Sequence, residues 1–177
     1  GWTYTWAVAA VGGTHVCLGK IDPVEIFTSI TQQGVTHFCG APVVLNMLIH
    51  APEEAKRSFP QIVNVATGGA APPSTVIERM QAMGFRIMHL YGLTETYGPC
   101  TINIPPLSLE NQPEEEQSRH KARQGFLNVL GGEMSVVDTE MQPVPAAGET
   151  LGEVVMRGNI VMKGYFGDEE ATEQAFA

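Results

Sequence analysis

The sequence predicts an α/β fold, a parallel sheet with flanking helices, followed by a smaller β-rich subregion. Over the first hundred residues, short apolar runs alternate with amphipathic segments of about ten residues, which is typical of parallel strands joined by helices. Beyond residue 125, alternating apolar and polar residues between Pro- and Gly-containing turns favour antiparallel strands. We therefore expect an α/β core subdomain at 1–104, an exposed loop with at most one short helix at 105–124, and a β-rich subdomain at 125–177.

The elements of the first region are predicted from apolar runs and from the residues that typically begin and end helices. The run 14–18 predicts a first strand. Asp22 is a typical helix N-cap, Pro23 suits the first helical position and Gly34 suits the helix end, so a helix is expected between Asp22 and Gly34. Apolar runs and Pro-initiated amphipathic segments predict the remaining elements, which are strands at 35–39, 62–66 and 86–90 and helices at 42–49 and 73–83.

The last region contains three short runs with strand character, at 133–138, 153–157 and 161–166. A Pro- and Gly-rich turn at 143–148 separates the first two, which favours an antiparallel arrangement. Residues 168–176 predict a short helix.

The composition excludes several classes of protein. The chain has 177 residues and a net charge of −9, so a long nucleic-acid backbone would be repelled. Three cysteines without CxxC spacing argue against a disulfide framework or a zinc site. No apolar run approaches the ~20 residues of a membrane-spanning helix. Because the chain starts at Gly1 and stops in mid-pattern, we expect an internal piece of a longer protein.

The run from Tyr91 to Cys100 is the strongest candidate for chemistry. It follows the predicted strand 86–90, and in open α/β sheets ligands bind beyond the carboxyl ends of the strands. The carboxylate of Glu95 suits Mg²⁺ beside a phosphate, and the hydroxyl of Thr94 can donate to a phosphate oxygen. The alternative is that both residues cap a following turn.

A second candidate is the turn after the predicted strand 62–66. Glycines there let a backbone approach a flat or anionic ligand closely, although an ordinary strand-to-helix turn is the alternative. The turn comprises Gly68, Gly69, Ala70 and Ala71. His15, His37 and His89 fall inside predicted strands and are interpreted as core histidines.

Four blocks occur in a characteristic order, and together they resemble the acyl-CoA synthetase branch of the adenylate-forming, or AMP-binding, superfamily. The blocks are Gly68-Gly69-Ala70-Ala71-Pro72-Pro73, Tyr91-Gly92-Leu93-Thr94-Glu95-Thr96, Gly152-Glu153-Val154-Val155-Met156-Arg157-Gly158 and Met162-Lys163-Gly164-Tyr165. The segments 35–42 and 121–125 are similar to plant acyl-activating enzymes or to bacterial medium-chain acyl-CoA synthetases. The chain would then lie inside the large N-terminal domain of such an enzyme.

The resemblance implies ATP-dependent activation of a fatty or aromatic acid to an acyl-adenylate, followed by transfer to coenzyme A. It implies that the turn Gly68, Gly69, Ala70 and Ala71 packs against adenine and shapes the acyl pocket. Tyr91 would lie on the adenine face and Gly92 would leave room for substrate. Thr94 would bind a phosphate oxygen and Glu95 would hold Mg²⁺, which makes these two the catalytic candidates.

The resemblance also places the family's phosphate loop, ribose-binding Asp and catalytic Lys outside this chain, so we expect the isolated chain to be inactive. One alternative, with the same chemistry, is an adenylation domain that loads a carrier protein or a luciferase-like enzyme. The other, from a different class, is a non-catalytic nucleotide-binding module. The expected partners are a small carboxylic acid, ATP and CoA, and the expected location is intracellular, either cytoplasmic or peroxisomal. The identity of the acid and the oligomeric state stay open.

Overall fold

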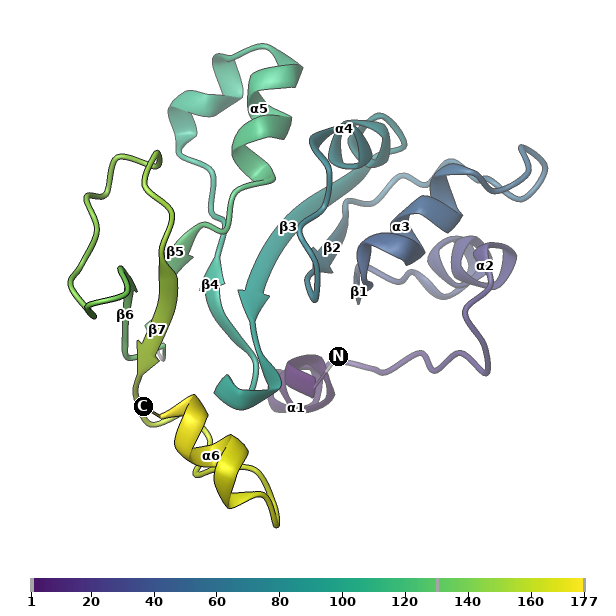
Figure 1. Cartoon of the computed structure of the whole chain (residues 1–177). Coiled ribbons are helices and arrows are strands. Elements are labelled where there is room, and N and C mark those ends of the chain that lie inside the picture. The colour runs from purple at the N-terminus through teal and green to yellow at the C-terminus, as the bar shows by residue number, and fades with distance from the viewer. Residues whose placement is uncertain (1, 130, 177) are drawn as a thin grey trace. The chain divides into compact units, whose positions relative to one another are not determined.

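The computed structural model describes residues 2–129 and 131–176 (Figure 1). Contacts group the chain into two compact units. Unit 1 comprises Gly1–Tyr91 and Ile102–Phe126, and unit 2 comprises Gly92–Thr101 and Leu127–Ala177. This grouping separates 92–101 from the rest of the expected 1–104 region, and the domain boundaries of the whole protein stay a prediction.

Unit 1 contains the predicted parallel sheet, which confirms the α/β class. Its strands β1 (His37–Cys39), β2 (Val63–Thr67) and β3 (Phe85–Gly92) are adjacent in that order. Val65 of β2 lies opposite Phe38 on one side and Ile87 on the other. Alternate residues of β3 are buried and exposed, so one face of this strand packs on the core. The three strands therefore end at one common edge, as the sequence predicts.

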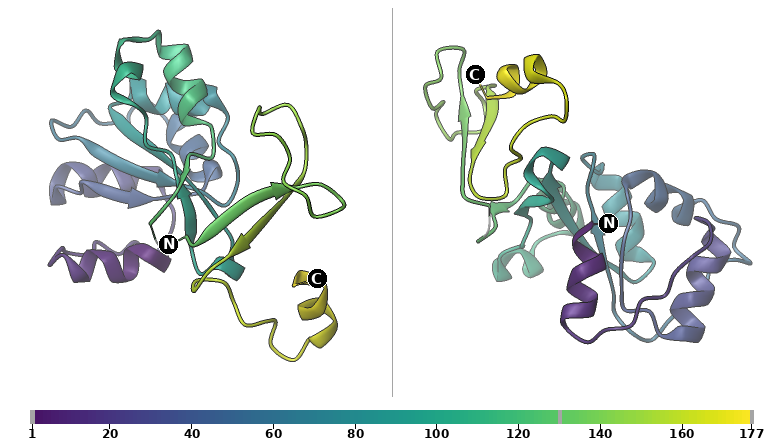
Figure 2. Two further views of the ribbon diagram at one scale, coloured as in Figure 1. Left: turned by 90° about the vertical axis from the view of Figure 1, so that its left-hand side faces the viewer. Right: turned by 90° about the horizontal axis from the view of Figure 1, so that it is seen from below.

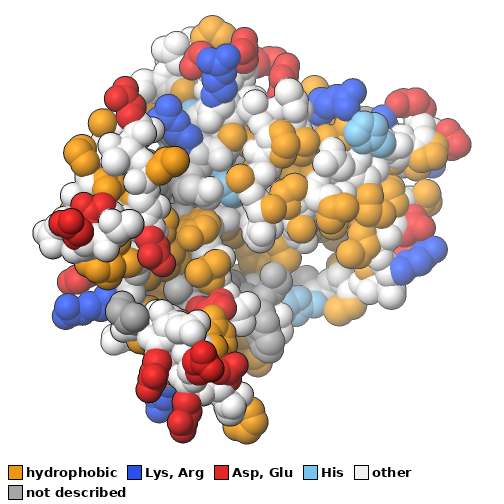
Figure 3. All heavy atoms as spheres, in the orientation of Figure 1, with side chains coloured by type: hydrophobic (Ala, Val, Ile, Leu, Met, Phe, Trp, Pro, Cys, Tyr) orange, Lys and Arg blue, Asp and Glu red, His pale blue; other side chains and the backbone are white. Residues whose placement is uncertain are grey.

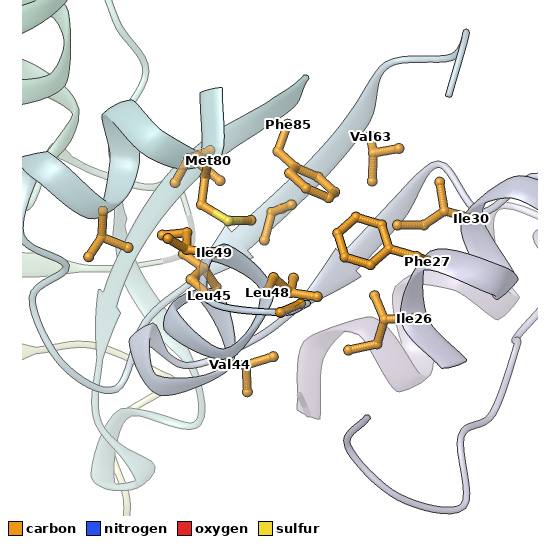
Figure 4. Close-up of a cluster of buried hydrophobic side chains, with 14 of the residues drawn as sticks. Ile26, Phe27, Ile30, Val44, Leu45, Leu48, Ile49, Val63, Met80 and Phe85 are labelled. Carbon is orange, nitrogen blue, oxygen red and sulfur yellow. The ribbon is translucent and has the colours of Figure 1, made fainter. Parts of the chain in front are cut away.

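Three helices of unit 1 share one hydrophobic core with these strands. They are α2 (Pro23–Gln33), α3 (Pro42–Ile49) and α4 (Ser74–Ala82), and all three match predicted helices. Figure 4 shows Phe27 of α2 and Phe85 of β3 turned toward each other, with ring centroids 6.3 Å apart. Each fully buried side chain of this size stabilises the fold by about 1.5–3 kcal/mol relative to exposure. This core holds the strand ends in place.

Helix α2 begins and ends where the sequence predicts. The carboxylate of Asp22 accepts hydrogen bonds from the backbone N–H groups of Val24 at 2.8 Å and Glu25 at 3.4 Å. Lys20 Nζ lies 3.1 Å from the same carboxylate. Gly34 ends the helix in the left-handed conformation, with φ +67°. Local sequence chemistry is sufficient to define this element.

The N-terminal residues differ from expectation. Helix α1 (Trp2–Ala10) was not predicted, and the strand predicted at 14–18 is wrong. That segment is mostly exposed, and within the described residues it joins no sheet, so its backbone groups take part in no ladder. His15 is accordingly exposed and contacts the carbonyl oxygen of Thr5 at 3.2 Å instead of lying in a core.

The segment 105–124, expected as an exposed loop with at most one short helix, contains two helices. It forms the 3₁₀ helix η2 (Leu107–Asn111) and α5 (Glu114–Lys121), and α5 packs against α4. Arg119 pairs with Glu115 at 2.7 Å, one helical turn away, which supports this very polar helix. Charges of both signs gather over α5 in Figure 3. The helix buries little of itself, and for this reason its sequence resembles a solvated loop.

Unit 2 contains the 3₁₀ helix η1 (Thr94–Thr96), two antiparallel strands and a short helix. The strands β6 (Glu133–Val137) and β7 (Glu153–Arg157) run side by side in Figure 2, and both were predicted. Helix α6 (Glu169–Ala175) was also predicted, and acidic side chains cover it in Figure 3. Two further short strands, β4 (Pro99–Ile102) and β5 (Phe126–Leu127), cross the boundary between the two units.

The strand predicted at 161–166 is wrong. Tyr165 forms only an isolated bridge with Asp168, and its backbone N–H donates to the Thr172 hydroxyl at 2.9 Å rather than to a neighbouring strand. Within the described residues, no helix is both long and apolar enough to cross a membrane.

Candidate functional site

The glycine turn lies at the carboxyl end of β2, beside β3. Thr67 is paired with His89 in the parallel register, so Gly68 comes next to Leu90. A Cβ at Gly68 would stand 2.7 Å from the carbonyl oxygen of Leu90, which is too close for any other residue. Gly69 then turns the chain with φ +83°. The predicted binding turn is therefore held tightly against the next strand.

The rest of the turn is open to solvent. Ala70 and Ala71 are both exposed, and Pro72 is buried as the chain turns into α4. Tyr91, half-buried, lies at the end of β3 and so at the same sheet edge as Gly68. Unit 1 thus brings together five of the predicted residues, namely Gly68, Gly69, Ala70, Ala71 and Tyr91.

The remaining predicted residues lie in unit 2, in the turn that follows Tyr91 along the chain. Gly92 starts this turn, and a Cβ there would stand 2.1 Å from the carbonyl oxygen of Gly98 and 2.9 Å from Cα of Pro99. The turn therefore closes on itself between Gly92 and Pro99 and admits no side chain at its first position.

The buried side chain of Thr96 holds this turn together. Its hydroxyl accepts the backbone N–H of Leu93 at 3.0 Å and lies 3.1 Å from Cys100 Sγ. It also lies within donating distance of the carbonyl oxygens of Leu93 at 3.1 Å and Gly98 at 3.2 Å. Thr96 is 4% exposed, so these contacts replace water. The turn-capping alternative that we considered for Thr94 and Glu95 is thus fulfilled by Thr96.

Thr94 has a different environment. It is exposed, and across residues 2–129 and 131–176 its hydroxyl has no hydrogen-bond partner. Its carbonyl oxygen accepts the N–H of Tyr97, which closes η1. The hydroxyl of Thr94 is therefore available to a ligand.

The carboxylate of Glu95 is held by a residue 70 positions later. Tyr165 donates its hydroxyl to Glu95 Oε1 at 2.8 Å. The backbone N–H of Met162 donates to the carbonyl oxygen of Glu95 at 2.7 Å. Both the side chain and the backbone of Glu95 are thus bound by the segment 162–165.

Hydrogen bonds to the carboxylate also set its charge. The pKa of Glu95 is lowered from its ordinary value, first by its own backbone N–H and then by the Tyr165 hydroxyl, both of which stabilise the ionised form. The pKa of Tyr165 is raised, mainly because its protonated hydroxyl donates a hydrogen bond to Glu95. Glu95 is therefore an anion at neutral pH.

The site suits a cation that needs few protein ligands. No group of three or more His, Cys, Asp or Glu side chains that could hold a metal occurs among the described residues. Mg²⁺ keeps several waters and commonly uses one or two carboxylates together with substrate phosphates. A single ionised Glu95 beside the free Thr94 hydroxyl fits Mg²⁺ in this mode and does not fit zinc, which takes N and S ligands.

The histidines contribute no cluster to the described site. His89 is 2% exposed, and its Nδ1 lies 3.1 Å and 2.9 Å from the carbonyl oxygens of Ala122 and Arg123. Because both partners accept, Nδ1 carries the proton. The interpretation of His89 as a core histidine is confirmed. The same interpretation is wrong for His15 and His37, which are exposed.

Sequence reasoning missed two residues of this site. Thr96 and Tyr165 entered the sequence analysis only as the last residues of the second and fourth motif blocks. The occurrence of Tyr165 in the fourth block of the ordered motifs was the signal that could have identified it, since no local pattern links it to Glu95.

The chain matches known proteins over nearly its whole length. A family model described as AMP-binding enzyme matches residues 1–166. An acetate–CoA ligase of Humulus lupulus is 49% identical over 100% of this chain and 32% of its own length. A peroxisomal acetate/butyrate–CoA ligase of Arabidopsis thaliana is 44% identical over the same shares. The chain thus spans about a third of the length of these curated relatives.

A solved structure has the same fold. It is the O-succinylbenzoate coenzyme A synthetase of Bacillus subtilis in complex with ATP and magnesium ion, with a TM-score of 0.74 and 23% identity. The match covers 97% of this chain and 33% of that one. Similarity at this identity is evidence for the fold alone.

Proposed function

Because this chain belongs to the AMP-binding enzyme family, we propose that it is part of a ligase that joins a carboxylic acid to coenzyme A at the expense of ATP. The observation that carries the proposal is the ionised Glu95 in a preformed turn, next to the unpartnered hydroxyl of Thr94. The names of the two plant relatives, both CoA ligases, support the same reaction class.

The proposed reaction has two steps. The carboxylate of the acid attacks the α-phosphorus of ATP, forming an acyl-adenylate as the bond to pyrophosphate breaks. The thiol of CoA then attacks the acyl carbon, giving a thioester and releasing AMP. Negative charge accumulates on phosphate oxygens in the first step, so the chain's contribution is to orient the phosphates and offset their charge.

The residues of unit 1 would bind the nucleotide. The tight packing of Gly68 on β3 and the exposure of Ala70 leave a bare stretch of backbone on which an adenine ring can lie. Tyr91 offers an aromatic face at the same edge of the sheet. Gly69 and Ala71 complete this proposed wall.

The residues of unit 2 would handle the phosphates. Thr94 would donate its hydroxyl to a phosphate oxygen, and Glu95 would hold Mg²⁺. When bound, Mg²⁺ would supply positive charge to the phosphate oxygens of ATP. Gly92 would let the turn before these two side chains close tightly, because the backbone of Gly98 and Pro99 fills the space that a side chain would need.

The acid is proposed to be short-chain, medium-chain or aromatic. Acetate and butyrate in the names of the two plant relatives support the short end of this range. An intracellular location, in the cytoplasm or the peroxisome, goes with this chemistry, and the peroxisomal assignment of the Arabidopsis relative supports it.

The test is an assay of the purified full-length protein with ATP, Mg²⁺, CoA and a panel of these acids. We expect acid-dependent AMP and acyl-CoA in equal amounts, measured by chromatography. Acyl-adenylate that is transferred to a carrier protein but never to CoA would reject the CoA ligase. Failure to form any acyl-adenylate across the panel would reject the whole proposal.

A further inference from the structure

Tyr165, which donates to Glu95, lies in a segment with several internal hydrogen bonds. The Tyr165 backbone N–H donates to Thr172 Oγ1 at 2.9 Å, and the Thr172 hydroxyl donates to the carbonyl oxygen of Asp168 at 2.7 Å. Asp168 also accepts the N–H of Ala171 at 3.0 Å and so caps α6. These bonds fix the backbone of Tyr165 against the first turn of α6.

The same segment holds Glu95 from the other side. The N–H of Met162 donates to the backbone carbonyl of Glu95. Tyr165, three residues later in the sequence, donates to the Glu95 side chain. Gly164 between them has φ +151°, and a Cβ there would stand 2.7 Å from the Thr172 methyl group. The Tyr165 ring therefore starts from a fixed backbone, and its hydroxyl reaches Glu95 Oε1 at a defined position.

We propose that Tyr165 is a positioning residue for the metal carboxylate, donating to Oε1 of Glu95 so that Oε2 is presented to the cation. This inference rests on the proposed role of Glu95 in holding Mg²⁺. A free Glu side chain samples several rotamers, whereas Mg²⁺ demands near-ideal octahedral geometry at about 2.0–2.1 Å from its ligands. A donor on one carboxylate oxygen restricts the other to one direction.

The role distinguishes metal binding from acid binding. Hydrogen-bond partners of metal ligands commonly contribute about 10–100-fold to metal affinity. Loss of the Tyr165 hydroxyl should therefore weaken binding of the divalent cation and leave the KM of the carboxylic acid unchanged. A purely structural role would change stability instead.

The test compares Tyr165→Phe with Tyr97→Phe in the full-length protein. Tyr97 lies two residues after Glu95, is 57% exposed, and its hydroxyl has no partner in the described part of the chain, so its variant removes the same group without the bond. Electron paramagnetic resonance would measure Mn²⁺ affinity in the presence of a non-hydrolysable ATP analogue. Pyrophosphate exchange at varied Mg²⁺ and thermal unfolding complete the set.

We expect Tyr165→Phe to lower the Mn²⁺ affinity about 10-fold. The Mg²⁺ concentration needed for pyrophosphate exchange should rise by a similar factor, and the unfolding temperature should not change. Tyr97→Phe should match the wild type. In a Glu95→Gln background, Tyr165→Phe should have no further effect on Mn²⁺.

Wild-type Mn²⁺ affinity in Tyr165→Phe, or the same loss in the Glu95→Gln background, would overturn the positioning role. A wild-type protein that binds Mn²⁺ through Glu95 but activates no acid would reject the proposed function and leave the positioning role standing.

Discussion

Gly68 packs directly against the carbonyl oxygen of Leu90, and this contact joins the ends of β2 and β3. Gly68→Ala should lower the free energy of unfolding by about 1–3 kcal/mol, since the added methyl group meets backbone rather than a movable side chain. Urea denaturation of the full-length protein measures this. Gly19→Ala is the control, because nothing lies within 4 Å of a Cβ at Gly19. Equal stability of the two variants would contradict the close packing.

The two threonines that flank Glu95 should respond differently to loss of the hydroxyl. Thr96→Val leaves the N–H of Leu93 without its partner inside the protein, so we expect a loss of about 1–3 kcal/mol in unfolding free energy. Thr94→Val should leave stability unchanged and lower the rate of adenylation. Denaturation and pyrophosphate exchange on both variants separate the effects. A destabilised Thr94→Val protein would be the opposite result.

Glu95→Gln should reduce kcat/KM for acyl-CoA formation by roughly 100-fold or more, because the neutral amide binds Mg²⁺ poorly and the phosphates then lose the positive charge that offsets their own. Glu133→Gln, an exposed carboxylate in β6 of the same unit, is the control and should retain full activity. Steady-state kinetics over a range of Mg²⁺ concentrations would detect the change. Turnover close to wild type in Glu95→Gln would remove the metal role.

The contribution of the Asp22 helix cap to folding stability should depend on pH. Its pKa is lowered first by the hydrogen bond from Lys20 and then by the N–H of Val24, so the folded value lies below the unfolded one. The charge of Asp22 therefore stabilises the fold above the unfolded pKa of about 3.9, and that contribution is lost as pH falls through the folded pKa. The wild type should exceed Asp22→Asn in stability at pH 7, and the difference should disappear in acid.

Thermal unfolding of both proteins between pH 7 and pH 3 tests this cap. Asn keeps a side-chain acceptor for the helix, so the comparison isolates the charge. A difference that grows as the solution becomes more acidic would show that the sign is wrong. High salt should also reduce this stability difference at neutral pH, since Lys20 is exposed and Asp22 is partly exposed.

Much of the fold could be predicted because local chemistry determines it. Asp22, Pro23 and Gly34 define α2 without any tertiary information, and the apolar runs of β2 and β3 are long enough to be recognised. The segments 14–18 and 161–166 have the same local character, yet neither belongs to a sheet in the part of the chain that the structure describes. Strand formation depends on a partner, and a local pattern does not report one.

The residues of the candidate site likewise fall into those that the local sequence could predict and those that it could not. Gly68, Tyr91 and Glu95 could be located because glycines and carboxylates at strand ends are visible in a sequence. The separate tasks of Thr94 and Thr96 could not be told apart, since both are threonines beside one glutamate. The bond from Tyr165 to Glu95 joins positions 70 residues apart, and no periodicity relates them.

The hydrogen bonds of Thr96 also influence the thermodynamics of ligand binding. They order the backbone around Thr94 and Glu95 when the chain folds, before a nucleotide arrives. Ordering the backbone of one residue opposes association by about 1–2 kcal/mol at 25 °C. A turn that is already formed spares an incoming ligand this entropic loss. Thr96 thus strengthens affinity by what it does to the empty protein.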